Sequence, residues 1–166
     1  MTTAHPYREL HFGVTRGVLT EGASGVQYLR AEQPLSPAAE RMTDRLLHWA
    51  ATAPERTWIA QRARNADGSK GDWQHITYGQ ALAQARSIAQ ALIARGLSDE
   101  RPVLILSENG TEHALLSLGC LLAGVPWCPA SPAYSTISTD YSKLRHVYNT
   151  LTPGLVFASD ASRYGK

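Results

Sequence analysis

The sequence predicts an α/β fold built around a partial doubly wound parallel sheet. Residues 103–106 form a short continuous apolar run, which is typical of a strand covered on both faces. A helical apolar pattern over 111–123 follows it, and Gly124 stands where a helix favours a left-handed stop. A second apolar run at 125–128 then predicts a strand–helix–strand unit. Such a crossover is right-handed and makes its two strands parallel.

The remainder of the C-terminal half repeats this alternation. Residues 129–136 are rich in Pro and Ser, and we expect an irregular loop there. Ser138 or Thr139 is expected to cap the next helix. Its apolar face comprises Tyr141, Leu144, Val147, Tyr148 and Leu151. Residues 155–158 predict a third buried strand, so the order is βαβαβ.

A helix is expected just before this region. Ser36-Pro37 has the chemistry of a helix start, with the serine as cap and the proline in the first turn. Pro54 ends the helical pattern. The apolar stripe between them consists of Met42, Leu46, Leu47, Ala50 and Ala53.

A β-hairpin and a second helix are expected between that helix and the sheet. Thr57–Arg62 and Asp72–Ile76 are predicted to be paired strands around an exposed loop at 65–71. Thr77 and Gln80 match a capping box, which predicts a helix ending near Gly96.

The N-terminal residues differ from all of this. Residues 1–35 show no sustained periodicity and are punctuated by glycines, with Val26–Arg30 as one short strand. We expect 1–35 to be an extended arm that lies on another surface. Residues 36–166 are expected to form a partial N-terminal α/β subdomain.

Composition excludes several functions. The net charge is +2 with no cluster of Lys or Arg, so no nucleic-acid partner is expected. No apolar run is long enough to span a membrane, and the N-terminus lacks the pattern of a signal peptide. Cys120 and Cys128 are interpreted as free thiols in the core, which favours the reduced cytoplasm as the location.

Ligands of doubly wound sheets bind beyond the carboxyl ends of the strands. Here those ends are 107–110, 129–136 and 159–162, and none carries an identifiable catalytic set. We therefore assign no catalytic, cofactor-binding or metal-binding residue.

Individual candidates each have a simpler interpretation. Gly68–Gly71 hints at a phosphate loop, but it lies between two strands rather than before a helix, so a solvated hairpin tip is favoured. The six histidines lack metal-ligand spacing. For His113, in the first turn of the helix at 111–123, a structural or solvated role is favoured over catalysis. Glu108 and Glu112 are favoured as carboxylates near a helix start over an acid–base pair.

Three segments in order carry a family resemblance: 76–82, 101–110 and 121–129. They resemble the opening section of the adenylate-forming enzymes, which include acyl-CoA synthetases, luciferases and peptide-synthetase adenylation domains. The "Thr-Tyr" helix start and the "Ala-Gly" turn before a Pro-flanked strand are the features in common. Residues 131–135, 143–147 and 151–158 look most similar to feruloyl-CoA synthases.

The resemblance implies a two-step reaction with ATP, Mg²⁺ and coenzyme A. A carboxylic acid, here ferulate or a related hydroxycinnamate, would form an acyl-adenylate and then a thioester. The family's phosphate loop, ribose-binding Asp, hinge and late Lys have no counterpart in these residues, so no catalytic residue carries over. We expect an N-terminal fragment of a ligase that is inactive alone and binds none of these cofactors tightly.

Two alternatives stay open at this stage. The chain could be a stand-alone doubly wound module that binds a small molecule, or an interaction piece that docks on another chain. In either case we expect self-association through an exposed sheet edge or exposed helices.

Overall fold

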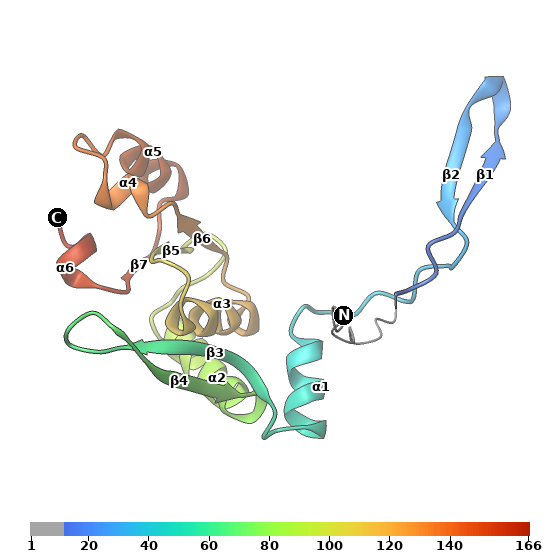
Figure 1. Cartoon of the computed structure of the whole chain (residues 1–166). Helices are drawn as coiled ribbons and strands as arrows, with labels where there is room; N and C mark the ends of the chain where they lie inside the picture. Colours follow the sequence, from blue (N-terminus) through green and yellow to red (C-terminus); the bar gives the residue numbers. More distant parts are fainter. Residues whose placement is uncertain (1–11) are drawn as a thin grey trace, which may run out of the picture. The chain divides into compact units, whose positions relative to one another are not determined.

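The computed structural model describes residues 12–166 (Figure 1). The chain divides into two compact units, one ending at Ala39 and the other running from Glu40 to Lys166. Part of the expected arm, residues 1–11, lies outside the described residues. Across the described part, no helix combines the length and apolar character needed to cross a membrane.

The described part of the first unit contains an antiparallel hairpin of β1 (Gly17–Glu21) and β2 (Gln27–Ala31). Between them lies a short 3-10 turn, η1 (Ala23–Gly25), in which Ser24 and Gly25 have φ values of 60° and 77°. The prediction of a single strand in this region was wrong. All ten strand residues are exposed, and without a buried face there is little apolar alternation to reveal β1.

A three-stranded parallel sheet forms the centre of the second unit. β5 (Val103–Leu106) pairs with β6 (Trp127–Ala130) on one side and with β7 (Leu155–Ala158) on the other. The predicted βαβαβ order and the parallel pairing are confirmed. β6 starts later than expected and includes Pro129, which an edge strand tolerates because one side of it needs no N–H donor.

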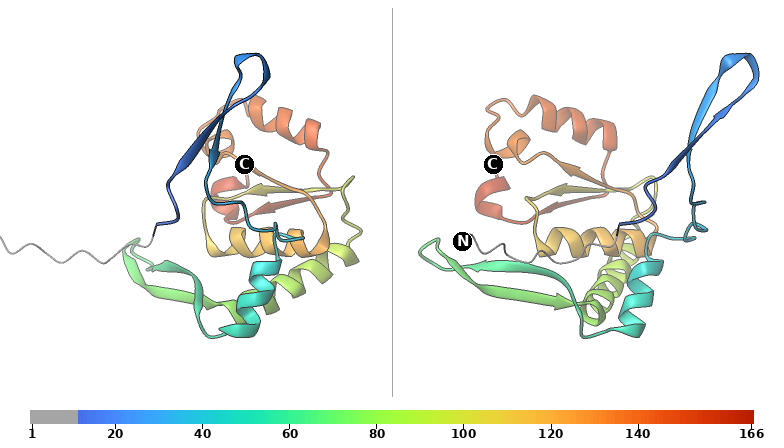
Figure 2. Two further views of the ribbon diagram at one scale, coloured as in Figure 1. Left: turned by 90° about the vertical axis from the view of Figure 1, so that its right-hand side faces the viewer. Right: turned by 45° about the vertical axis from the view of Figure 1, so that its right-hand side comes forward.

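Helices cover both faces of this sheet, as a doubly wound arrangement requires (Figure 2). α2 (Tyr78–Ala94) and α3 (Thr111–Ala123) lie on one face, and their core includes Leu92, Val103, Ile105, Leu116 and Cys120. α5 (Ser142–Leu151) and the one-turn α6 (Ala161–Tyr164) lie on the other. Their core contains Leu104, Leu106, Ala130 and Tyr164.

The predicted hairpin and the helix after it are confirmed. β3 (Thr57–Arg64) pairs antiparallel with β4 (Lys70–Thr77). At the start of α2, the Gln80 N–H donates to Thr77 Oγ1 at 3.3 Å, and Gln80 Oε1 accepts from the Thr77 N–H at 3.0 Å. Gly96, just past the end of α2, has a φ of 68°, and Gly124 ends α3 with a φ of 69°.

The predicted start of the first helix was wrong. α1 runs over Asp44–Thr52, with Thr43 before it, rather than from Pro37. Met42, expected in the apolar stripe, is 81% exposed, whereas Leu46 is buried against the neighbouring elements. The Ser-Pro start is locally suitable, but residues 36–42 are all exposed and bury no side chain that would hold a helix in place.

Two further starts and one loop also differ from expectation. Gly110, not Thr111, precedes α3, and α5 begins at Ser142 after Tyr141, which has a φ of 54°. Ser138 contributes by accepting the Tyr141 N–H at 3.0 Å. Within the loop expected at 129–136, Ala133–Thr136 forms the one-turn helix α4, because the Pro132 carbonyl accepts the Thr136 N–H and hydroxyl.

Candidate functional site

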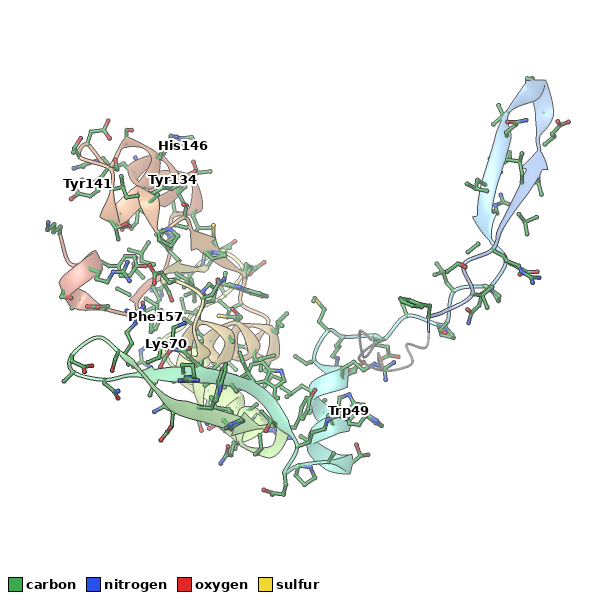
Figure 3. The ribbon with its side chains drawn as sticks, viewed as in Figure 1. Trp49, Lys70, Tyr134, Tyr141, His146 and Phe157 are labelled. Carbon is green, nitrogen blue, oxygen red and sulfur yellow. The ribbon has the colours of Figure 1, made fainter. Side chains whose placement is uncertain are left out.

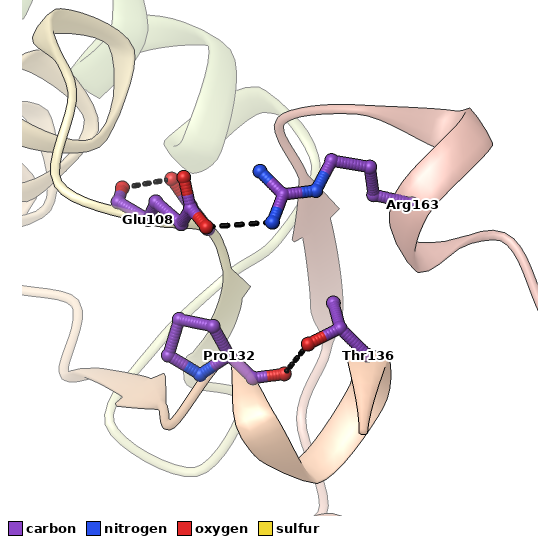
Figure 4. Close-up of polar contacts among 5 residues, drawn as sticks. Glu108, Pro132, Thr136 and Arg163 are labelled. Atoms are coloured by element: carbon purple, nitrogen blue, oxygen red, sulfur yellow. Dashed lines mark hydrogen bonds and ion pairs between the residues drawn. The ribbon is translucent and has the colours of Figure 1, made fainter. Parts of the chain in front are cut away.

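The carboxyl ends of β5 and β7 are joined by an ion pair. Glu108, just past β5, accepts from Arg163 of α6, with 2.6 Å between Oε1 and Nη2 (Figure 4). The Arg163 hydrogen bond and charge lower the pKa of Glu108, and the same contact raises the pKa of Arg163. Both side chains are about half exposed. The pairing occupies Glu108, and the geometry does not assign it an acid–base role with Glu112.

The segment after β7 is anchored to β5 and then starts α6. The Ser159 N–H donates to the Leu106 carbonyl at 3.1 Å. Asp160 Oδ1 accepts from the Ser162 N–H at 2.8 Å and from its hydroxyl at 2.6 Å, and these bonds lower the pKa of Asp160. This cap positions Arg163 for the pairing with Glu108.

His113 lies beside a small cavity between β3 and the start of α3. The cavity, of about 410 Å³, is lined by Ile59, Ala60, Gln61, Asn109, Gly110, His113 and Ala114. Gln61 Oε1 accepts the Thr111 N–H at 3.0 Å and so ties β3 to the first turn of α3. Nδ1 of His113 is buried and has no partner among residues 12–166. The structural or solvated role favoured for His113 stays a prediction.

The Gly68–Gly71 segment lies in the β3–β4 hairpin and not before a helix. Gly68 has a φ of 82°, and Asp67 Oδ1 accepts the Ser69 N–H at 2.9 Å. Lys70, labelled in Figure 3, is the first residue of β4. A phosphate loop needs a following helix that presents its N-terminus, and this turn lacks one. The interpretation as a hairpin tip is confirmed.

The two cysteines are free thiols, as predicted. Cys120 is fully buried against the sheet, and burial raises its pKa to about 11. A nucleophilic thiol needs the opposite shift, a lowered pKa in a polar setting, so Cys120 is a core residue. Cys128 on β6 is half-buried.

No group of three or more His, Cys, Asp or Glu side chains that could hold a metal ion occurs in the described residues 12–166. At the strand ends the exposed carboxylate of Glu108 is already held by Arg163. This donor set does not fit a magnesium–nucleotide site. The assignment of no catalytic or cofactor-binding residue is a prediction that awaits experiment.

Sequence reasoning missed a second cavity, of about 510 Å³, on the α5 side of the sheet. Ser135 and Tyr164 line it and were not singled out, because they are 29 positions apart and follow no motif. Only packing of α4 and α6 against the same face brings them together.

The match to a family profile decides the identity of this fold. The profile of the AMP-binding enzymes matches residues 46–164. The chain belongs to the AMP-binding enzyme family. This AMP-binding family chain therefore carries the N-terminal region of an adenylate-forming ligase, with the expected sheet and helices.

Individual relatives agree with this assignment. One of the linear gramicidin synthase proteins of Brevibacillus parabrevis is 36% identical over 76 residues, which are 46% of this chain and 2% of that protein. An isonitrile lipopeptide synthase of Streptomyces coeruleorubidus is 34% identical over 77 residues, which are 45% of this chain and 5% of that protein.

Solved structures match over most of the chain. A fatty acyl-adenylate ligase from L. pneumophila superposes with a TM-score of 0.61 at 23% identity, over 72% of this chain and 20% of that one. A putative long-chain-fatty-acid CoA ligase from Rhodopseudomonas palustris gives a TM-score of 0.55 at 26% identity, over 73% of this chain and 27% of that one. The chain thus spans about a fifth to a quarter of these solved structures.

Proposed function

We propose that this chain is the N-terminal part of an ATP-dependent acid–CoA ligase. The observation that carries the proposal is the family match over residues 46–164, which falls on the part of the fold that holds the parallel sheet. The likeness to a putative long-chain-fatty-acid CoA ligase supports a thioester product. The complete enzyme would form an acyl-adenylate from a carboxylic acid and ATP with Mg²⁺, and coenzyme A would then displace AMP.

The acid is proposed to be ferulate or a related hydroxycinnamate. The support is the resemblance of residues 131–135, 143–147 and 151–158 to feruloyl-CoA synthases. The relatives and solved structures above belong to peptide synthesis and fatty-acid activation, so they support the reaction class more than this acid.

The 166-residue chain is proposed to be inactive alone, because its strand ends offer no group for nucleotide phosphates or magnesium. Exchange of labelled pyrophosphate into ATP, measured on the purified chain with and without ferulate, tests this. We expect no acid-dependent exchange. Ferulate-dependent exchange would refute the inactivity, and exchange with another acid alone would refute the substrate.

A second experiment tests whether the chain is part of a larger ligase. The reading frame downstream of Lys166 should encode a Ser/Thr/Gly-rich phosphate loop ending in Pro-Lys. If it does, expression of the longer product should yield ferulate-dependent thioester formation. An in-frame stop with no such loop would favour a separate role for the 166 residues.

The location is proposed to be the cytoplasm, on the basis of the two free thiols. Self-association is proposed through the open edge of β7, where Val156 is 44% exposed. A clean monomer by light scattering at high concentration would contradict it.

A stand-alone interaction module is the second candidate. The β1–β2 hairpin favours it, since Leu19 and Leu29 are 59% and 75% exposed as a cross-strand pair. A two-stranded hairpin is marginal without a surface to pack on. Wild-type-like behaviour of a chain lacking residues 1–39 in every binding assay would remove this candidate.

A further inference from the structure

We propose that the cavity on the α5 side of the sheet binds a small amphipathic carboxylate. This inference goes beyond the proposed function, because it concerns binding by these 166 residues alone. It comes from the shape of the cavity, from two buried hydroxyls without partners, and from the charge of the residues around them.

The cavity has an apolar floor made by the sheet. Leu104 and Leu106 of β5 and Val156 of β7 point to this face, since Leu104 and Val156 are register partners in parallel strands. Leu144 of α5 lines the cavity as well. Its volume of about 510 Å³ lies within the range of small-molecule sites, ~300–1,000 Å³.

Two hydroxyl groups at this cavity have no partner in the described part of the chain. Ser135 is 6% exposed and Tyr164 is 8% exposed, so each is more than nine-tenths buried. Ser135 Oγ and the Tyr164 hydroxyl are covered and make no hydrogen bond. A buried hydroxyl without a partner is costly, and a bound acceptor would relieve that cost.

The charge of the lining favours an anion. Arg145 of α5 and Lys166 line the cavity, together with Asn149, and the lining contains no Asp or Glu. A carboxylate can accept from a guanidinium and from hydroxyl groups at the same time, and charge-assisted bonds of this kind are the stronger ones. An apolar body on the leucine and valine floor with a carboxylate toward Arg145 satisfies both halves of the cavity.

The cavity also explains why this face differs from the opposite one. On the α2 and α3 side, Phe157 of β7, labelled in Figure 3, packs into a closed core. On the α5 side, Val156 stays 44% exposed beside the cavity. Tyr141, also labelled in Figure 3, lines the cavity where α4 leads into α5.

Calorimetric titration of the purified chain tests the proposal with phenylbutanoate, and with phenylbutanol as a neutral match. We expect saturable binding of the acid with a dissociation constant on the order of 100 μM to 1 mM. The alcohol should bind at least about tenfold more weakly, because it lacks the charge-assisted bonds.

Variants localise the binding. R145Q should weaken the acid about tenfold or more. K143Q is the matched control, because Lys143 is on the same helix but lies over the Tyr134 ring, 5.7 Å from its centroid, and does not line this cavity. Ser135→Ala and Tyr164→Phe should weaken the acid about threefold to tenfold and leave the chain folded, since they remove hydroxyls that have no partner.

Two results would overturn the proposal. One is equal affinity for the acid and the alcohol, or for the parent and R145Q, which would mark the groove as an apolar face that another polypeptide segment covers. The other is the absence of saturable acid binding at ~5 mM, well above the expected range. Neither result bears on pyrophosphate exchange, so this proposal and the proposed function fail independently.

Discussion

Gly119 of α3 lies directly against Ile88 of α2, and a Cβ at position 119 would stand 2.3 Å from Cγ2 of Ile88. The nearest backbone atom, the Ala85 carbonyl oxygen, would be 3.4 Å away. Glycine is therefore required for the close approach of the two helices that cover one face of the sheet. This contact transmits the packing of α2 onto the core around Cys120 and Leu116.

Gly119→Ala should lower the free energy of unfolding by about 1–3 kcal/mol, the usual cost of overpacking a well-packed core. Chemical denaturation followed by circular dichroism measures it. Ile88→Ala removes the side chain that clashes, so Gly119→Ala should cost clearly less in that background. Strict additivity of the two changes would show that the clash with Ile88 is not the cause.

Thr77→Ala should destabilise the chain by about 0.5–2 kcal/mol, because it removes the acceptor of the Gln80 N–H at the start of α2. Thermal unfolding measures the loss. Thr77→Ser keeps the hydroxyl and should retain most of the stability. An alanine variant as stable as the parent would mean that tertiary packing alone holds this helix end.

The ion pair between Glu108 and Arg163 should be visible in titration. Carbon-detected NMR should place the pKa of Glu108 below its ordinary value, and R163Q should return it toward that value, because Arg163 is the main cause of the shift. A lowered folded-state pKa stabilises the fold above the unfolded-state pKa, and that contribution is lost as the pH falls through the folded value. Solvent screens both side chains, so the change in stability should be small. An unshifted Glu108 in the parent would contradict the pairing.

Cys120 should resist alkylation in the folded chain, because it is buried and its pKa is about 11. At mildly alkaline pH, mass spectrometry should find iodoacetamide on the half-buried Cys128 first, with Cys120 modified only on unfolding. A raised folded-state pKa also means that the stability from Cys120 is complete below the unfolded-state pKa and is lost as the pH rises toward about 11. In C128S, rapid labelling without denaturant would show that Cys120 is accessible.

The parts of the fold that were predicted correctly depend on local chemistry. The apolar run at 103–106, the stop at Gly124 and the capping box of Thr77 act through neighbouring residues along the chain. Turn and cap geometry need few contacts from elsewhere, so these signals survive in the tertiary structure. The same holds for the β3–β4 hairpin around Gly68.

The errors occurred where burial outweighed local preference. Ser36-Pro37 is suited to start a helix, yet α1 begins at Asp44, near the first side chains that pack against other elements. The β1–β2 hairpin was half missed because it buries none of its strand residues. No local pattern encodes a contact that a distant segment supplies.

By itself the sequence determined the order of strands and helices, the parallel sheet that this order requires, and the resemblance to the adenylate-forming enzymes. Only the tertiary structure decided that β5 lies between β6 and β7, that Arg163 reaches Glu108, and that Ser135 and Tyr164 meet at one cavity. The reason is separation along the chain, since Glu108 and Arg163 are 55 positions apart. Periodicity reports which face of an element is apolar, whereas the choice of partner depends on the three-dimensional packing of all the faces at once.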